Sequence, residues 1–206
     1  KTHEAIKPSP VISVAGLIKG SHNIRTRKIS TSHPVIVLVG TTFDELGGSE
    51  YYSVMNNKNS GIVPKLNFEL EKKAQKLVRD GIKVGLFGAV NDCSKGGLVH
   101  SLLQMCMSGD IGASVDLSKI PTNCKRWDDV LFSESHSRFL VTIKEKNLVN
   151  LLNISRNHNI PVSIIGYVGG KDLELKNNDD VLFSSEITYI SDSVYSSLSK
   201  LMDDAV

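Results

Sequence analysis

The 206-residue chain lacks the features that would place it in several large classes of protein. Its three cysteines contain no C-x-x-C pair, which argues against a zinc ribbon or a dithiol redox motif. The longest apolar runs, such as 35–39, are far too short to span a bilayer, and the opening residues do not resemble a signal peptide. We therefore expect no membrane partner and a cytoplasmic protein with free thiols at Cys93, Cys106 and Cys124.

An excess of charge of one sign is also missing. The 24 basic and 22 acidic residues leave a formal net charge of +2, so neither a nucleic-acid-binding protein nor an acidic tail is indicated. No G-x-x-x-x-G-K-[ST] loop, no G-x-G-x-x-G after a strand and no G-x-S-x-G elbow is present. The six histidines show no metal-ligand spacing: His3, His22, His33, His100, His136 and His158.

What is present is the composition of an ordinary globular protein. With 40% hydrophobic and 22% charged residues, the chain can bury a proper core. Residues 1–32 are predicted to be an interdomain connector and the tail of a preceding domain, with a strand at 11–18 and a polar, basic surface stretch at 21–32. A compact domain is predicted over 33–206. Because the chain begins without an initiator methionine, we expect a fragment of a longer protein.

Strands and helices alternate through the compact domain. The apolar run 34–39 ends at Gly40 and is typical of a strand buried on both faces. From Asn67 to Asp80 apolar residues recur at helical spacing, with Asn67 as the N-cap and Gly81 as the stop. This order predicts an α/β (α+β) fold with a mixed β-sheet covered by helices. The other expected elements are helices after Ser49 and at 98–107, 145–157 and 192–203, strands at 113–117, 139–143 and 161–169, and a hairpin of 172–175 with 181–183.

Three segments carry polar residues in patterns that suit an anion. The first, 44–52, places Gly47, Gly48 and Ser49 before a helix. Such a turn leaves backbone N–H groups free to point at an anion, and the helix dipole adds to the attraction. The alternative is a tight turn in which Ser49 is the N-cap of the helix.

The second segment, 91–98, places Asp92 and Ser94 two positions apart, followed by Gly96 and Gly97 at a helix start. An aspartate supplies a hard oxygen ligand for Mg²⁺, and a serine hydroxyl and backbone N–H groups can face phosphate oxygens. The pattern therefore suits a nucleotide phosphate with Mg²⁺. The alternative is a helix cap in which Asp92 or Ser94 satisfies the free amides.

The third segment, 132–138, is a dense polar cluster next to a buried strand. Glu134 and Arg138 can form an ion pair, or Arg138 and the hydroxyls can contact a bound anion. Alternatively, a Glu–Arg pair and serine caps fix the loop without any ligand. No residue of the chain is predicted to be catalytic.

In this order, the motifs LGGSEY at 46–51, D-x-S-x-G-G-L at 92–98 and FSES-x-SR at 132–138 resemble the second C-terminal-type domain of the phosphoribosylformylglycinamidine synthase family. The middle motif is shared with aminoimidazole ribonucleotide synthetase and its wider superfamily, whereas the outer two point to the purine enzyme. Residues 5–10 and 14–18 resemble the junction after that enzyme's second N-terminal-type domain. The resemblance covers essentially the whole chain.

The resemblance implies a fold like the C-terminal domain of aminoimidazole ribonucleotide synthetase and part of an ATP-dependent ligase of purine biosynthesis. The full enzyme would bind ATP, Mg²⁺ and formylglycinamide ribonucleotide, and ammonia from a glutaminase would displace an activated amide oxygen. The partners would be the remaining synthase domains and the glutaminase. The chain alone is expected to be inactive, because much of the machinery lies in those other domains.

Carried over residue by residue, the resemblance places Mg²⁺ on Asp92 and the nucleotide on Ser94, with Gly96 and Gly97 matching the family pattern. Lys95 stands where the family usually has Asp, which either suits a phosphate or marks a site that has lost its metal. His136 stands where Gln is common. The competing hypotheses are a purely structural domain that packs on the catalytic half without a ligand, and a phosphotransferase similar to thiamine-monophosphate kinase, against which the FSES stretch argues.

Overall fold

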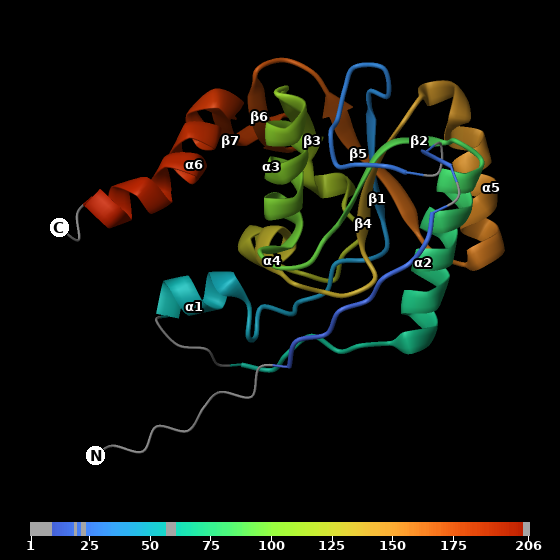
Figure 1. Cartoon of the computed structure of the whole chain (residues 1–206), viewed down its shortest axis with the longest axis horizontal. Helices are drawn as coiled ribbons and strands as arrows, with labels where there is room; N and C mark the ends of the chain where they lie inside the picture. Colours follow the sequence, from blue (N-terminus) through green and yellow to red (C-terminus); the bar gives the residue numbers. More distant parts are fainter. Residues whose placement is uncertain (1–9, 19, 22–23, 57–60, 204–206) are drawn as a thin grey trace.

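The computed structural model describes residues 10–18, 20–21, 24–56 and 61–203. One sheet of seven strands lies between two layers of helices (Figure 1). The strands are β1 Val35–Val39, β2 Phe87–Asp92, β3 Ala113–Asp116, β4 Phe139–Ile143, β5 Val162–Val168, β6 Asp172–Asn177 and β7 Asp180–Glu186. The helices are α1 Glu50–Asn56, α2 Phe68–Lys83, α3 Gly97–Gly109, α4 Trp127–Phe132, α5 Leu148–His158 and α6 Ile187–Asp203, with short 3₁₀ turns at Leu117–Lys119 and Glu145–Asn147.

The strand order is β2-β4-β1-β5-β3-β6-β7. Neighbouring strands are antiparallel except β3 and β6, which run parallel. The interior strand β1 consists of five aliphatic residues that are all buried, as the apolar run predicted. The expected mixed sheet covered by helices is therefore confirmed, and so is the hairpin, in which Asn177 pairs with Asp180.

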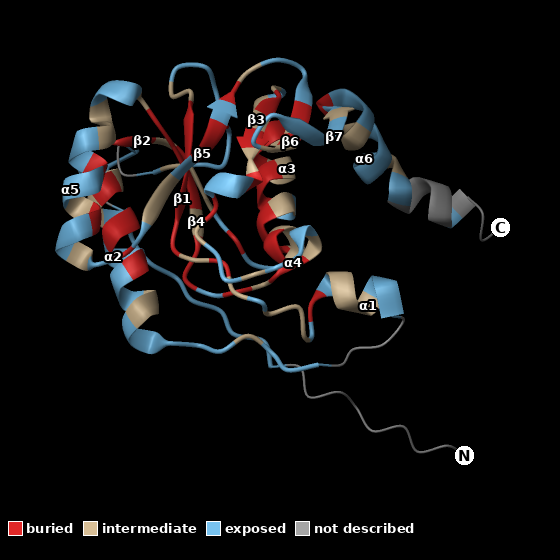
Figure 2. Cartoon of the chain, turned by 180° about the vertical axis from the view of Figure 1, so that it is seen from behind, coloured by how far each residue is buried: buried red, intermediate tan, exposed pale blue. Residues whose placement is uncertain are grey.

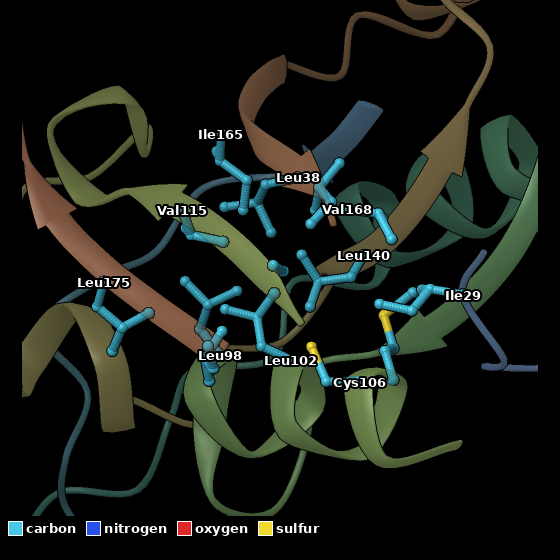
Figure 3. Close-up of a cluster of buried hydrophobic side chains, with 14 of the residues drawn as sticks. Ile29, Leu38, Leu98, Leu102, Cys106, Val115, Leu140, Ile165, Val168 and Leu175 are labelled. Atoms are coloured by element: carbon cyan, nitrogen blue, oxygen red, sulfur yellow. The ribbon is translucent and has the colours of Figure 1, made fainter. Parts of the chain in front are cut away.

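The two faces of the sheet are covered by different helices. Helices α2 and α5 pack over β2, β4 and β1, and α3 and α4 lie on the opposite face with the start of α6 (Figure 1). Each face of the sheet has its own hydrophobic core. In the core under α3, Leu98, Leu102 and Cys106 point toward Leu38 and Leu140 of the sheet (Figure 3). Burial is concentrated on the central strands and on the inward stripes of the helices, whereas the edge strand β7 is mostly exposed (Figure 2).

Helix α2 begins as expected but ends later. The Asn67 side chain accepts a hydrogen bond from the Leu70 N–H at 3.0 Å, which confirms the predicted N-cap. Gly81 is not the stop, because the helix runs to Lys83. Gly81 is buried, and a Cβ there would collide with the Phe87 ring. The glycine allows helix α2 and strand β2 to pack closely together. From sequence alone, a glycine in this role cannot be distinguished from one that ends a helix.

The strand expected over 11–18 is not formed. These residues have no ladder partner among those described, and Val11 and Leu17 are 95% and 102% exposed. High β propensity without a neighbouring strand does not make a strand. Further along, Ile29 is 2% exposed and belongs to the core, so the prediction that 21–32 lies on the surface is wrong at this residue.

Two elements that border the motifs were not predicted. Strand β2 has the sequence FGAVND, in which glycine, asparagine and aspartate hide the strand character. Helix α4 has six residues, too few to show a helical period. Helix α6 starts at Ile187 rather than 192, and α5 follows a 3₁₀ turn rather than starting at Glu145.

Candidate functional site

Sheet pairing brings two of the three motifs together. Strand β2 lies beside β4, and Asp92 at the end of β2 is paired with Phe139 at the start of β4. Just beyond them, the Cys93 N–H donates to the Arg138 carbonyl at 3.0 Å. The second motif leaves β2 where the third motif enters β4, so both loops lie at the same end of the sheet.

The serines of the third motif bind the first motif. Ser135 Oγ accepts a hydrogen bond from the Phe43 N–H and Ser133 Oγ accepts one from the Glu45 N–H, each at 3.1 Å. Both serines are completely buried. Their hydroxyls act as backbone partners for 43–45, which joins all three motifs into one assembly. The serines therefore fix this loop as the alternative without a ligand expected, but they do so by binding a distant backbone segment and not as helix caps.

Arg138 is buried, with 1% of its surface exposed, and organises the same loop. Its guanidinium donates to the carbonyls of Ser133 (2.6 Å) and Ser135 (3.0 Å) and to the Thr42 hydroxyl (2.9 Å). Burial lowers the pKa of Arg138. The expected ion pair between Glu134 and Arg138 is not formed within the described part of the chain. Arg138 instead fixes the backbone on both sides of Glu134.

The Glu134 carboxylate joins the beginnings of two helices. Its Oε1 accepts hydrogen bonds from the Gly96 N–H at 2.8 Å and from the Glu50 N–H at 3.0 Å. Gly96 is the N-cap residue of α3, and no side chain of the preceding turn caps this helix. The capping alternative for Asp92 and Ser94 is therefore wrong. One of the amides expected to face a phosphate is occupied by Glu134.

The turn before α1 is held by contacts of its own. Ser49 Oγ accepts a hydrogen bond from the Tyr52 N–H at 3.1 Å, which confirms Ser49 as the N-cap. Gly47 lies directly against the Ile62 backbone, and Gly48 has a φ of +72°, so both positions require glycine. These glycines and Ser49 do not line the cavity between the motifs. A role for them in anion binding stays a prediction.

A cavity of about 210 Å³ lies where the second and third motifs meet. Asp92, Ser94 and Lys95 are exposed on its wall. Within the described chain, neither the Asp92 carboxylate nor the Ser94 hydroxyl has a hydrogen-bond partner. The other lining residues are Glu71, Cys93, Glu134, His136, Ser137, Arg138 and Phe139.

Charged side chains surround the two free groups. The ammonium of Lys95 lies 2.8 Å from a carboxylate oxygen of Glu50, and this hydrogen bond raises the pKa of Lys95. Elsewhere in the lining, the Ser137 hydroxyl donates to Glu71 Oε2 at 2.6 Å. Sequence reasoning missed Glu71, because an acidic residue in the first turn of a helix is ordinary.

The donor set for a metal is incomplete within this chain. Across the described ranges, no three His, Cys, Asp or Glu side chains stand together as a metal site. Glu71 and Glu134 are engaged in hydrogen bonds, whereas Asp92 has a free carboxylate. A Mg²⁺ ion here would take Asp92 as one ligand and complete its shell with phosphate oxygens, water or groups from elsewhere.

The mixed sheet and the three motifs together are features of a known class of α/β domains. A family model described as "AIR synthase related protein, C-terminal domain" matches residues 33–176, and the chain belongs to this family. More particularly, it is similar to the phosphoribosylformylglycinamidine synthase subunit PurL of Methanococcus aeolicus, with 34% identity over 201 residues that cover 98% of this chain and 26% of that protein. The chain thus spans about a quarter of the length of the curated relatives it matches.

Solved structures of Thermotoga maritima PurL have the same fold. The complex with FGAR matches with a TM-score of 0.74 at 18% identity over 83% of this chain and 30% of that one. The complex with ATP matches with a TM-score of 0.70 at 20% identity over 83% of this chain and 28% of that one. The predicted fold class is therefore confirmed. Over the residues that the structure covers, no helix is both long and apolar enough to cross a membrane.

Proposed function

We propose that this chain is the C-terminal part of a cytoplasmic phosphoribosylformylglycinamidine synthase. This ATP-dependent ligase converts formylglycinamide ribonucleotide and ammonia into formylglycinamidine ribonucleotide, and a glutaminase supplies the ammonia. Similarity to a PurL subunit over 98% of the chain supports the assignment. The same fold occurs in Thermotoga maritima PurL, which has been solved with ATP and with FGAR.

Within that enzyme, we infer that the cavity beside Asp92 holds part of a Mg²⁺-nucleotide phosphate. The observation that carries this inference is that the Asp92 and Ser94 side chains stay unpartnered just before a helix. In a domain built for stability alone, such residues would cap the helix. Here Glu134 serves the helix from another segment, which leaves Asp92 and Ser94 for a ligand.

The charges on the cavity wall favour a phosphate that carries its metal. The carboxylates of Glu71, Asp92 and Glu134 line the cavity, together with the positively charged Lys95 and the buried Arg138. A free polyanion would be repelled by this excess of carboxylates, whereas a metal-complexed phosphate is closer to neutral. When bound, Mg²⁺ neutralises phosphate charge during phosphoryl transfer.

The residues of this chain would bind and orient the nucleotide. Asp92 supplies one hard oxygen ligand, the Ser94 hydroxyl donates to a phosphate oxygen, and the Lys95 ammonium, paired with Glu50, adds positive charge. The remaining synthase domains would supply the other side of the site.

Replacing Asp92 in the full-length synthase tests this proposal. Asp92→Ala should weaken Mg²⁺-ATP binding by on the order of 1–3 kcal/mol, because a ligand to a charged group is lost. Ser94→Ala should cost less, because it removes one neutral donor. Thermal shifts of wild type and variants, each with and without Mg²⁺-ATP, provide the measurement. Asp192→Ala, an exposed carboxylate on α6, is the matched control.

The structural-domain hypothesis predicts another result. If Asp92→Ala lowers the melting temperature equally with and without nucleotide, and the shift induced by ATP stays intact, the nucleotide-site assignment fails.

A further inference from the structure

We propose that Glu134 is a positioning residue of the cavity. Its carboxylate fixes the 94–97 turn against the 48–50 turn, and thereby places Asp92 and Ser94 toward the ligand. The inference rests on the proposed nucleotide-phosphate site, and it gives Glu134 a role other than the predicted ion pair with Arg138.

Few direct contacts join the two turns to each other, although each turn also packs beside α4: the Tyr51 ring stacks on Phe132, and Gly97 lies against the 131–133 backbone. Helix α1 is seven residues long and has no buried residue. Ser94 and Lys95 are exposed. The ion pair of Lys95 with Glu50 also spans the two turns, but its side chains are 75% and 54% exposed, and such pairs contribute little. The remaining direct link is Glu134 Oε1, which accepts one backbone N–H from each turn.

The position of Glu134 itself is set by buried contacts. Its neighbours Ser133 and Ser135 are tied to 43–45 through their hydroxyls, and their carbonyls are held by Arg138. A carboxylate that accepts two backbone N–H groups forms charge-assisted hydrogen bonds, which are stronger than neutral ones. Glu134 therefore ties the buried loop to the backbone of both turns.

The same contact determines where an anion can bind. Because the Gly96 N–H already donates to Glu134, the N-terminus of α3 is occupied by a carboxylate of the protein itself. A ligand phosphate therefore approaches the side of the cavity formed by Ser94 and Lys95.

Matched substitutions in the full-length synthase test this role. Asp116 is the control, because its carboxylate likewise accepts two backbone N–H groups, from Ser118 at 3.0 Å and Asn178 at 3.1 Å, and does not line the cavity. Glu134→Ala and Asp116→Ala should lower the melting temperature, whereas Glu134→Ala alone should weaken Mg²⁺-ATP binding, by roughly tenfold. Glu134→Gln, which keeps an acceptor oxygen in place, should recover most of the affinity. Titration calorimetry with Mg²⁺-ATP provides the dissociation constants.

Equal weakening by Glu134→Ala and Asp116→Ala would reduce Glu134 to a stabilising residue and overturn the inference. So would a Glu134→Gln variant that binds as poorly as Glu134→Ala. If Glu134→Ala does not fold, Glu134→Asp takes its place, because it keeps the charge but withdraws the oxygen. Loss of binding in Asp92→Ala but not in the Glu134 variants would refute the positioning role alone. Unchanged binding in Asp92→Ala would refute the proposed site.

Discussion

Arg138 donates hydrogen bonds to three acceptors that are buried away from water. Its guanidinium satisfies the carbonyls of Ser133 and Ser135 and the hydroxyl of Thr42. Arg138→Met should destabilise the chain by about 3 kcal/mol or more, because each buried acceptor left unpaired is costly. Arg138→Lys should recover little, since one ammonium does not reproduce the planar fork. Urea unfolding measures the loss.

The control for Arg138 is Arg156→Met, on the exposed side of α5. A similar small effect of both substitutions would show that the loop does not depend on the buried guanidinium.

At this scale, the sequence predicted contacts between near neighbours and missed those between distant ones. The Ser49 cap spans three positions and could be anticipated from spacing alone. The partners of Glu134 lie 38 and 84 positions away, so the sequence suggested the nearby Arg138 as its partner instead. Asp92 and Ser94 were predicted as candidate ligand-binding residues. Only the structure shows that neither side chain caps helix α3.

Among the elements, the segment before β1 shows where the compact part begins. Ile29 is buried beside Gly109 of α3, and the Val90 N–H donates to the Thr26 carbonyl at 3.0 Å. Ile29→Ala should cost about 2–4 kcal/mol, as expected for a large core residue. The half-exposed Ile24 supplies the control, since Ile24→Ala should change stability by less than about 1 kcal/mol.

Chemical denaturation of the two variants compares them directly. Equally small losses would mean that residues 24–32 only rest on the surface, and the predicted division at His33 would then hold. A larger loss for Ile29→Ala would extend the compact domain back to include Ile29.

Strand formation depended on partners more than on composition. The aliphatic segment 11–18 has the better β propensity, yet β2 forms the strand because β4 lies beside it. Strong local patterns, such as the apolar run of β1 and the turn between β6 and β7, were enough to predict those elements. Sequence periodicity did not disclose β2, whose pairing aligns two of the motifs.

For the whole molecule, the chain covers 26% of the length of its Methanococcus aeolicus relative, and its cavity presents one free carboxylate. We expect the purified 206-residue chain to have no synthase activity, because other domains must complete the metal shell and the substrate site. Ammonia-dependent formation of formylglycinamidine ribonucleotide is the assay. Turnover by this chain alone, confirmed with an Asp92→Ala control that abolishes it, would contradict the expectation.

The long sequence separation between the interlocked motifs also affects how the protein is made. Phe43 and Ser135 are 92 positions apart, and Glu45 and Ser133 are 88 apart. At ribosomal rates of about 5–20 residues per second, the first motif waits roughly 5–20 seconds for its partners to be synthesised. Contacts of such separation also form slowly once the chain is complete. The Ser49 cap needs only residues three positions apart, whereas the cavity wall can form only after β4 has emerged and paired.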